Sequence, residues 1–324
     1  MSLDLSALDN QPRLLIEVPL RPIQGSRFQP TGFPDLGAAT FKGFDGSGQS
    51  IDCLLVESAQ SMANRLENVC WDEGKDELVA PLTGLPYVQA TLPDGTITDS
   101  IREAHRLNSP YIASSNSVAF EAIKKDIGFE ANQPFNRRKL AKALMKYDPC
   151  SLLHGTFLEK IGGVVRLPRT ISAFVEANGI EVASAGGVKF DRVQPGTSEN
   201  TPYGKAAEGY GNVPYHRDEY TAKSIIAFFN LDLAQLRGYG LGKDAEQLLI
   251  AISLFKIRKF LHEGLRLRTA CDLEQANGIK VKRPTKFELP EIETIEKALP
   301  DLMKATKKSF AEPAITKLTY SRKK

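Results

Sequence analysis

The sequence predicts an α+β fold, and three observations carry that prediction. Apolar and polar residues alternate over 13–21 and 225–235, which is the pattern of strands with one buried face. Apolar residues recur three and four positions apart over 244–262, which is the pattern of a buried helix. Strands and helices follow one another without the regular spacing of repeated β–α–β units, so a mixed α+β arrangement is expected rather than a parallel α/β sheet.

The composition indicates a globular protein with a sizeable core. Of the 324 residues, 42% are hydrophobic and 25% are charged, as in ordinary folded domains. No run approaches the roughly 18 apolar residues of a membrane span, and the N-terminus has neither the basic nor the apolar region of a signal peptide. We therefore expect a cytoplasmic protein without membrane association. Reduced thiols are expected rather than a zinc site or disulfides, because the cysteines are widely separated and form no CxxC pair: Cys53, Cys70, Cys150 and Cys271.

The net charge of +3 conceals an uneven distribution. Residues 1–110 include 15 acidic and 8 basic residues, whereas residues 111–324 include 24 acidic and 34 basic ones. The basic excess is concentrated in 133–170 and 255–286. Such clusters suit a polyanionic partner, because each base that neutralises a phosphate releases condensed counterions. Solvated helix faces are the alternative explanation of the same clusters.

The first predicted elements are a strand, a loop, a second strand and a helix. The strand over 13–21 has one aliphatic side, formed by Leu14, Ile16, Val18 and Leu20. A loop rich in Gly, Pro and Phe follows over 25–48, and an apolar run over 51–56 leads into a helix with Ser58 as its N-cap. The apolar stripe of this helix consists of Ala59, Met62, Ala63 and Leu66, so its other face, which includes Asn64 and Arg65, should be exposed.

The middle of the chain is predicted to hold insertions. A cluster of acids and a Pro-Asp-Gly turn at 93–95 indicate an irregular segment over 72–110. Helical patterns return at 117–127 and 136–147. Glycine is dense over 162–214, and there we expect turns and long loops around short strands.

The last third contains the strongest predicted pair of elements. The strand over 225–235 has one clean core face, formed by Ile225, Ala227, Phe229, Leu231 and Leu233. The helix over 244–262 has a wide apolar face and should be well buried. A further strand is expected over 265–273. A mostly helical tail should follow over 290–310, with Lys304, Lys307 and Lys308 on it.

Sequence templates for catalysis fit poorly. The chain has no GxxxxGK[ST], HExxH or GxSxG motif, and no GxGxxG follows a predicted strand. The histidines show no metal-ligand spacing: His105, His154, His216 and His262. His154 and His216 are the candidates for acid and base in RNA cleavage, because imidazole titrates near neutrality. A hydrogen-bonding or phosphate-contacting role is the simpler one for a loop histidine, so we predict no catalytic residue and no metal site.

Two runs combine the residue types that hold single-stranded RNA. The run 186–192 joins two glycines to Lys189 and Arg192, which suits phosphate contact, and a tight hairpin with exposed charges is the alternative. The run 209–220 interleaves aromatic rings with amide, imidazole and guanidinium groups, which offers stacking surfaces beside phosphate donors. Its candidate ligands are His216, Arg217 and Tyr220.

A third run, 265–269, contains two arginines one residue apart. Strand alternation would place Arg266 and Arg268 on the same face, opposite Leu265 and Leu267. Two neighbouring guanidiniums repel each other unless an anion or carboxylates lie between them, so this face suits RNA. A structural salt bridge is the alternative.

Together these motifs resemble a known family. The resemblance is carried by 58–67 (SAQSMANRLE), 153–155 (LHG), 186–192 (GGVKFDR), 211–214 (GNVP), 217–222 (RDEYTA) and 264–271 (GLRLRTAC). They look like the signature of the Cas-seven group backbone protein of type I-G (formerly I-U) CRISPR systems, within the RAMP superfamily. The similarity spans nearly the whole chain, and several motifs in one order are more specific than any single motif.

The resemblance implies a fold and a set of partners. The fold is a modified RNA-recognition-motif (ferredoxin-like) palm that makes 1–324 one domain with inserted helical and glycine-rich thumb segments. We accordingly expect a helical lobe at 72–150, a loop or thumb segment at 193–220 and a basic helical tail at 288–324. The implied partners are a CRISPR guide RNA, target DNA held through that guide, copies of the chain stacked head to tail, and other Cascade subunits. No cofactor is implied.

The resemblance also places RNA binding on the matching positions. The candidate RNA-binding residues are Asn64, Arg65, Lys189, Arg192, His216, Arg217, Tyr220, Arg266 and Arg268. Type I relatives of this kind are not nucleases, so the resemblance implies a guide-RNA coat and no enzyme. An RNA endonuclease of the RAMP superfamily remains the alternative, using His154, His216 or a loop aspartate such as Asp191 or Asp218. A housekeeping RNA-binding protein outside CRISPR is a third reading.

Overall fold

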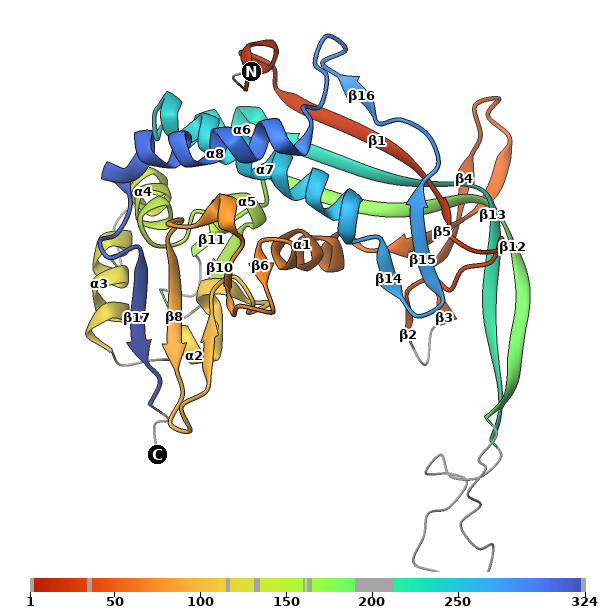
Figure 1. Cartoon of the computed structure of the whole chain (residues 1–324), viewed down its shortest axis with the longest axis horizontal. Helices are drawn as coiled ribbons and strands as arrows, with labels where there is room; N and C mark the ends of the chain where they lie inside the picture. The colour runs from red at the N-terminus through yellow and green to blue at the C-terminus, as the bar shows by residue number, and fades with distance from the viewer. Residues whose placement is uncertain are drawn as a thin grey trace, which may run out of the picture.

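The main sheet begins with strand β1 (Arg13–Pro22), whose predicted alternation is confirmed because its aliphatic side chains are buried in turn. The computed structural model describes residues 3–33, 37–114, 117–130, 135–159, 161, 165–189 and 213–321. β1 lies near the middle of the sheet, and the side chains on its buried face form a continuous row in the core (Figure 1).

In the described part of the chain, eight strands form this sheet, and all their pairings are antiparallel. The strand order is β14-β15-β1-β13-β12-β5-β4, and β16 pairs with β1 beside β15. The other strands are β4 (Thr40–Phe44), β5 (Ser50–Glu57), β12 (Ile171–Lys189), β13 (Val213–Asp232), β14 (Arg266–Arg268), β15 (Cys271–Gln275) and β16 (Lys280–Arg283).

Two helices, α1 (Ala59–Asn68) and α7 (Lys243–Glu263), cover one face of the main sheet (Figure 1). The predicted core face of β13 turns toward α7, where the rings of Phe229 and Phe260 meet edge to face with centroids 6.2 Å apart. The prediction of a strand to residue 235 is wrong at its end, because Leu233 begins helix α6. The predicted helix over 244–262 is confirmed, and its wide apolar face is buried because α8 (Ile292–Thr306) covers the side that the sheet leaves open.

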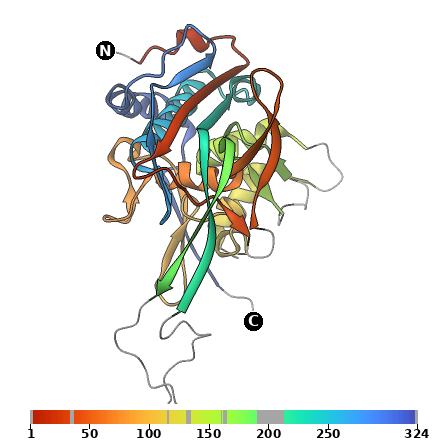
Figure 2. The ribbon, with the colours of Figure 1, turned by 90° about the vertical axis from the view of Figure 1, so that its right-hand side faces the viewer.

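Strands β12 and β13 run on beyond the sheet as a two-stranded arm (Figures 1 and 2). Their pairing is continuous from Ile171↔Leu231 to Lys189↔Val213. In β12 alternate side chains over 171–177 are buried, whereas most side chains over 181–189 are exposed. The arm therefore projects from the body with little packing against it.

The prediction of short strands and loops over 162–214 is wrong for the arm. Glycine density predicted turns, yet Gly186 lies within β12, where an added Cβ would meet the carbonyl oxygen of Tyr215 at 2.6 Å. Glycine here permits close approach of the paired strand rather than a change of direction. Residues 213–220 of the predicted thumb likewise belong to β13, and residues 193–212 lie outside the described residues.

A second sheet stands beside the main one, built from the inserted segment and the C-terminus (Figure 1). Its strand order is β17-β8-β9, with β17 (Ile315–Thr319) parallel to β8 (Tyr87–Thr91). The helices predicted at 117–127 and 136–147 are present as α3 (Val118–Ile127) and α4 (Arg137–Tyr147). The tail is helical in α8 as expected, but its last described residues form strand β17 of the second sheet. Leu318 of this strand is buried beside β8.

Short elements connect these layers. They are η1 (Ser6–Leu8), β2 (Gly32–Phe33), β3 (Gly37–Ala38), β6 (Trp71–Asp72), β7 (Glu77–Leu78), η2 (Ala80–Leu82), β9 (Ile97–Asp99), η3 (Arg106–Asn108), α2 (Pro110–Ala113), α5 (Cys150–His154), β10 (Thr156–Leu158), β11 (Val165–Leu167), α6 (Leu233–Gly238) and η5 (Lys307–Ser309). The α+β class is confirmed by this mixture of antiparallel sheets and helices. Within the described residues, no helix is both long and apolar enough to span a bilayer.

Candidate nucleic-acid interface

Helix α1 begins at the predicted N-cap, where Ser58 Oγ accepts a hydrogen bond from the backbone N–H of Ser61 at 3.3 Å. Met62, Ala63 and Leu66 are buried as the apolar stripe predicted, and Glu67 is buried with them. Asn64 is exposed on the opposite side. The cap and the stripe together fix which side chains of α1 face outward.

Arg65 and Arg268 meet at one buried carboxylate, that of Glu57 at the end of β5, which is 2% exposed. Arg65 Nη2 lies 3.4 Å from Glu57 Oε2 and donates to the carbonyl of Leu267 at 2.6 Å. Arg268 pairs with the same oxygen, and its Nη1 donates to the carbonyl of Gln29 at 2.9 Å. We call this group the Glu57 cluster.

The Glu57 cluster corrects two expectations about side-chain placement. Arg65 was expected to be free on the outer face of α1, and it is half-buried in an ion pair instead. Arg266 and Arg268 were expected to share an RNA-facing surface, but only Arg266 is exposed. Leu265 and Leu267 are buried as the alternation predicts, but the buried carboxylate of Glu57 attracts Arg268, and the pairing of β14 with β15 shifts register between the two arginines.

The arm holds most of the other predicted RNA ligands. His216 is exposed, with its Nε2 3.8 Å from Asp218 Oδ1. Arg217 Nε donates to Glu219 Oε1 at 2.9 Å. Tyr220 was expected to offer a stacking surface, and instead it is buried at the base of the arm, where its backbone pairs with that of Phe28.

Two further predicted residues mark the far end of the described arm. Lys189 is exposed at the last described position of β12. Arg192 and the loop aspartate Asp191 lie outside the described residues. The arm therefore offers His216 and Lys189 on its exposed outer half.

A pocket of about 750 Å³ opens where α1 meets η3 and the β10–β11 hairpin. Its lining includes Asn64, Arg106, His154, Thr156, Arg166 and Arg169. None of the described residues that line it is an aspartate or a glutamate. We call it the donor pocket, because its charged side chains are all hydrogen-bond donors.

Behind the donor pocket lies a buried charged network. Lys256 of α7 is completely buried, and its Nζ lies 2.8 Å from His154 Nε2 and 3.4 Å from Cys150 Sγ. Arg106 pairs with the buried Glu67 of α1 through both carboxylate oxygens. Burial raises the pKa of Glu67 to about 7, against the opposing effect of Arg106.

The network fixes the protonation of His154. Burial opposes the charge of Lys256, whereas Cys150, Cys70 and Glu67 favour it, and the net effect is a raised pKa of Lys256. Burial, together with Lys256, lowers the pKa of His154 well below its usual value, so the ring is neutral. Nε2 of the ring is in contact with Nζ of Lys256, and Nδ1 has no hydrogen-bond partner among the described residues.

A second pocket adjoining α1, of about 460 Å³, has a different charge balance. It is lined by bases and acids together, among them Arg65, Asp72, Glu73, Lys259, Glu263 and Arg266. Asn68 of α1 also lines it. We call it the mixed pocket, because its bases have carboxylates beside them.

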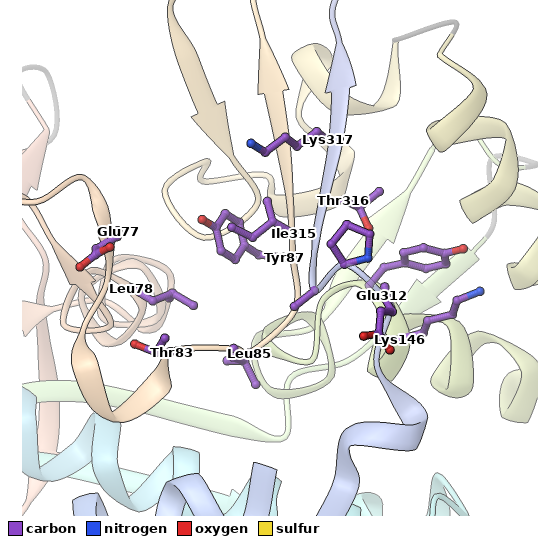
Figure 3. Close-up of a pocket in the computed structure, with 15 residues that line it drawn as sticks. Glu77, Leu78, Thr83, Leu85, Tyr87, Lys146, Glu312, Ile315, Thr316 and Lys317 are labelled. Atoms are coloured by element: carbon purple, nitrogen blue, oxygen red, sulfur yellow. The ribbon is translucent and has the colours of Figure 1, made fainter. Parts of the chain in front are cut away.

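A third pocket, of about 980 Å³, lies beside β8 and β17 (Figure 3). Its walls are largely apolar, with Leu78, Tyr87 and Ile315 among them. Its charged residues have both signs, namely Glu77, Lys146, Glu312 and Lys317. This composition does not favour a polyanion, so the third pocket is not part of the candidate interface.

A known protein family matches the part of the chain that contains the motifs in α1 and directly before β10. Residues 14–182 match the model of the family described as CRISPR-associated protein GSU0053. The chain belongs to this family. The matched range contains α1 and the segment 153–155, and it ends within β12 before the outer half of the arm. The resemblance found in the sequence motifs is thereby confirmed.

The CRISPR-associated chain also resembles solved structures at low similarity. One is a chain titled "CRISPR RNA-guided surveillance complex, pre-nicking", with 12% identity, 91% of this chain and 89% of that chain covered, and a TM-score of 0.39. Another is Csc2 of Thermofilum pendens, with 10% identity, coverage of 94% and 81%, and a TM-score of 0.32. No curated protein matches the sequence.

Sequence reasoning missed most of the donor pocket in this CRISPR-associated chain. Arg166 and Arg169 lie in the basic stretch 133–170, so charge alone could have drawn attention to them. Lys256 was visible as a lone charge on the apolar face of the helix over 244–262. Arg106 gave no sign in the sequence, because its importance depends on the buried Glu67 on a different element.

Proposed function

We propose that this protein is the guide-RNA-binding backbone subunit of a type I-G CRISPR surveillance complex. The observation that carries the proposal is its membership of the CRISPR-associated family. Repeated copies would coat the guide, stack head to tail and hold target DNA through base pairing with the guide. Such a coat needs phosphate contacts and little base-edge recognition, because the guide itself supplies sequence specificity.

The strand topology supports an RNA-recognition-motif palm. The elements β1, α1, β12, β13, α7 and β15 follow one another in the β-α-β-β-α-β order of ferredoxin-like domains. Their strands lie side by side as β15-β1-β13-β12, all antiparallel, with both helices against one face. On this reading β4 and β5 extend the palm at one edge, and the arm is an extension of two palm strands.

The state of His154 supports a binding role over a catalytic one. Its Nε2 is in contact with Nζ of Lys256 at 2.8 Å, the residue is 1% exposed, and burial lowers the pKa of the ring well below its usual value. A general base needs a basic nitrogen within reach of the proton that it removes, and burial reduces both the basicity and the access of this ring. We therefore propose that the protein is not an enzyme.

His216 and Asp218 keep a nuclease as the second candidate. Both are exposed on the arm with 3.8 Å between Nε2 and Oδ1, a spacing that one small movement would turn into a hydrogen bond. RNA cleavage by this pair would require His216 in particular.

Incubation of the purified protein with labelled single-stranded RNA, with and without divalent metal, separates the two candidates. The backbone role predicts intact RNA in a ladder of complexes that grows with RNA length. Affinity should depend weakly on sequence and fall steeply with salt. Cleavage products that disappear in His216→Ala would establish the nuclease and defeat the backbone role.

A further inference from the structure

The donor pocket is built for a negatively charged ligand. Arg106, Arg166 and Arg169 reach it from two segments, and no described lining residue is a carboxylate. Arg106 has its counter-charge behind the pocket, in Glu67. Among the ion pairs of the described residues, none involves Arg166 or Arg169: Arg166 lies over the ring of Phe157 at 4.4 Å, and Arg169 donates to the carbonyl of Ala59 at 3.2 Å.

Two buried polar groups in the lining have no partner among the described residues. Nδ1 of His154, a residue that is 1% exposed, makes no hydrogen bond. The hydroxyl of Thr156, 8% exposed, is also unpaired. A buried polar group without a partner is costly in a folded protein, so two of them in one pocket indicate a ligand that forms hydrogen bonds with the lining.

The backbone around the pocket is held in demanding conformations. Gly155 has a φ of +76°, and a Cβ there would lie 2.6 Å from the carbonyl oxygen of Leu167. Arg106 adopts a φ of +52°, which is uncommon for a residue with a side chain. Strained positions of this kind collect at binding sites, where the surrounding structure maintains them.

Arginine repulsion points to the same ligand. Burial, with the charge of Arg106 next, lowers the pKa of Arg169. Two guanidiniums that disfavour each other in this way are stabilised together by an anion between them.

We propose that the donor pocket binds the phosphate group of a nucleotide. Arg169 and the hydroxyl of Thr156 would contact the phosphate oxygens, and the amide of Asn64 would contact the sugar or base. A volume of about 750 Å³ accommodates a nucleotide. The proposal rests on the proposed function in one respect, because it takes the nucleotide to be part of the bound RNA strand. A free ribonucleotide would present the same phosphate chemistry and is the other source.

Four variants of the full chain test the pocket with a short single-stranded RNA. Arg169→Gln should weaken RNA binding about tenfold, as expected for loss of a charge-assisted contact. Thr156→Val keeps the shape and removes the unpaired hydroxyl, so it should weaken binding while leaving the melting temperature unchanged or raised. Asn64→Ala should weaken binding, and Asn68→Ala, one turn along α1 in the mixed pocket, should not.

A second arm compares uridine monophosphate with uridine as ligands in a thermal-shift measurement. A shift with the monophosphate alone that is lost in Arg169→Gln supports the pocket. If the unchanged protein binds no RNA but shows this shift, the pocket holds a free nucleotide and the proposed function fails. If RNA binding is the same in the unchanged protein, Arg169→Gln and Thr156→Val, the pocket proposal is overturned and the proposed function stands.

Discussion

The donor pocket and the mixed pocket both adjoin α1, but their positive charge is balanced differently. Three arginines line the donor pocket, and none of the described lining residues is a carboxylate. In the mixed pocket Arg65, Lys259 and Arg266 lie among Asp72, Glu73 and Glu263. The number of basic residues alone therefore does not distinguish the two pockets. They differ in whether the fold brings carboxylates to the same place.

The Glu57 cluster extends this lesson. Glu57 is almost fully buried and is paired with two arginines. The role of these guanidiniums is therefore to neutralise a buried charge rather than to bind a ligand. Removing one partner of such a buried pair costs about 3–5 kcal/mol. Structural and ligand-binding arginines should therefore separate in their effects on stability, and the following predictions test that separation.

The largest effect is expected for Arg268→Glu, which would place a second carboxylate beside Glu57. The free energy of unfolding should fall by more than about 3 kcal/mol, because a buried charge loses its partner and gains a repulsive neighbour. Arg266→Glu, two residues away and exposed, should change it by less than about 1 kcal/mol. Urea denaturation of both variants measures the difference, and equal stabilities would show that the Glu57 cluster is not structural.

The next largest effect is expected for Gly155→Ala at the edge of the donor pocket. A methyl group would meet the carbonyl of Leu167, and the positive φ would be strained, so a loss of about 2–4 kcal/mol is expected. Gly238→Ala is the matched control, because no atom lies within 4 Å of its added Cβ. It should leave the melting temperature unchanged or raise it slightly. A well-tolerated Gly155→Ala would contradict the described backbone.

A pH-dependent effect is expected from Asp148, which is buried beside Ser151. Burial raises the pKa of Asp148 to about 6, from 3.8, so the folded state holds its proton more tightly than the unfolded state. Stability from this group is present below about pH 4 and is lost as the pH rises toward 6.

Asp148→Asn removes this titration. Relative to the unchanged protein, the variant should gain about 1–3 kcal/mol between pH 4 and pH 7, as melting curves across that range can measure. The exposed Asp94, whose pKa is lowered by hydrogen bonds from Thr96, is a control with the opposite direction. If the stability difference between Asp148→Asn and the unchanged protein does not vary with pH, Asp148 does not titrate in this range and the prediction is wrong.

The smallest effect is expected for Asn64→Ala and Asn68→Ala. Both asparagines are exposed on α1, so each change should alter the free energy of unfolding by no more than about 0.5 kcal/mol. Circular dichroism melts test this directly. Any difference in RNA binding between the two variants can then be assigned to the pockets and not to folding.

Much of the fold was predictable because its strongest patterns are local. Alternation identified β1 and the sheet part of β13, and spacing identified α1 and α7. The arm was not predictable, because its glycines suggest turns but lie within two long strands that pair with each other. Pairing along a ladder is a tertiary property that a single segment does not reveal.

The site was predictable only where a residue's role does not depend on a distant partner. Exposure of Asn64 followed from the stripe on α1. The ion pair of Arg268 with Glu57 did not follow, since 211 positions separate them. The donor pocket draws on three separate segments, so no run of sequence contains it.

Sequencing the RNA that co-purifies with the protein, expressed together with a CRISPR array, tests the central claim most directly. The account predicts RNA of defined length that contains repeat-derived sequence, with several copies of the protein on each strand. It also predicts that this RNA is retained at low salt and released as salt is raised. Protein that is free of RNA, or bound to cellular RNA of mixed origin, would contradict the assignment as a guide-RNA backbone subunit.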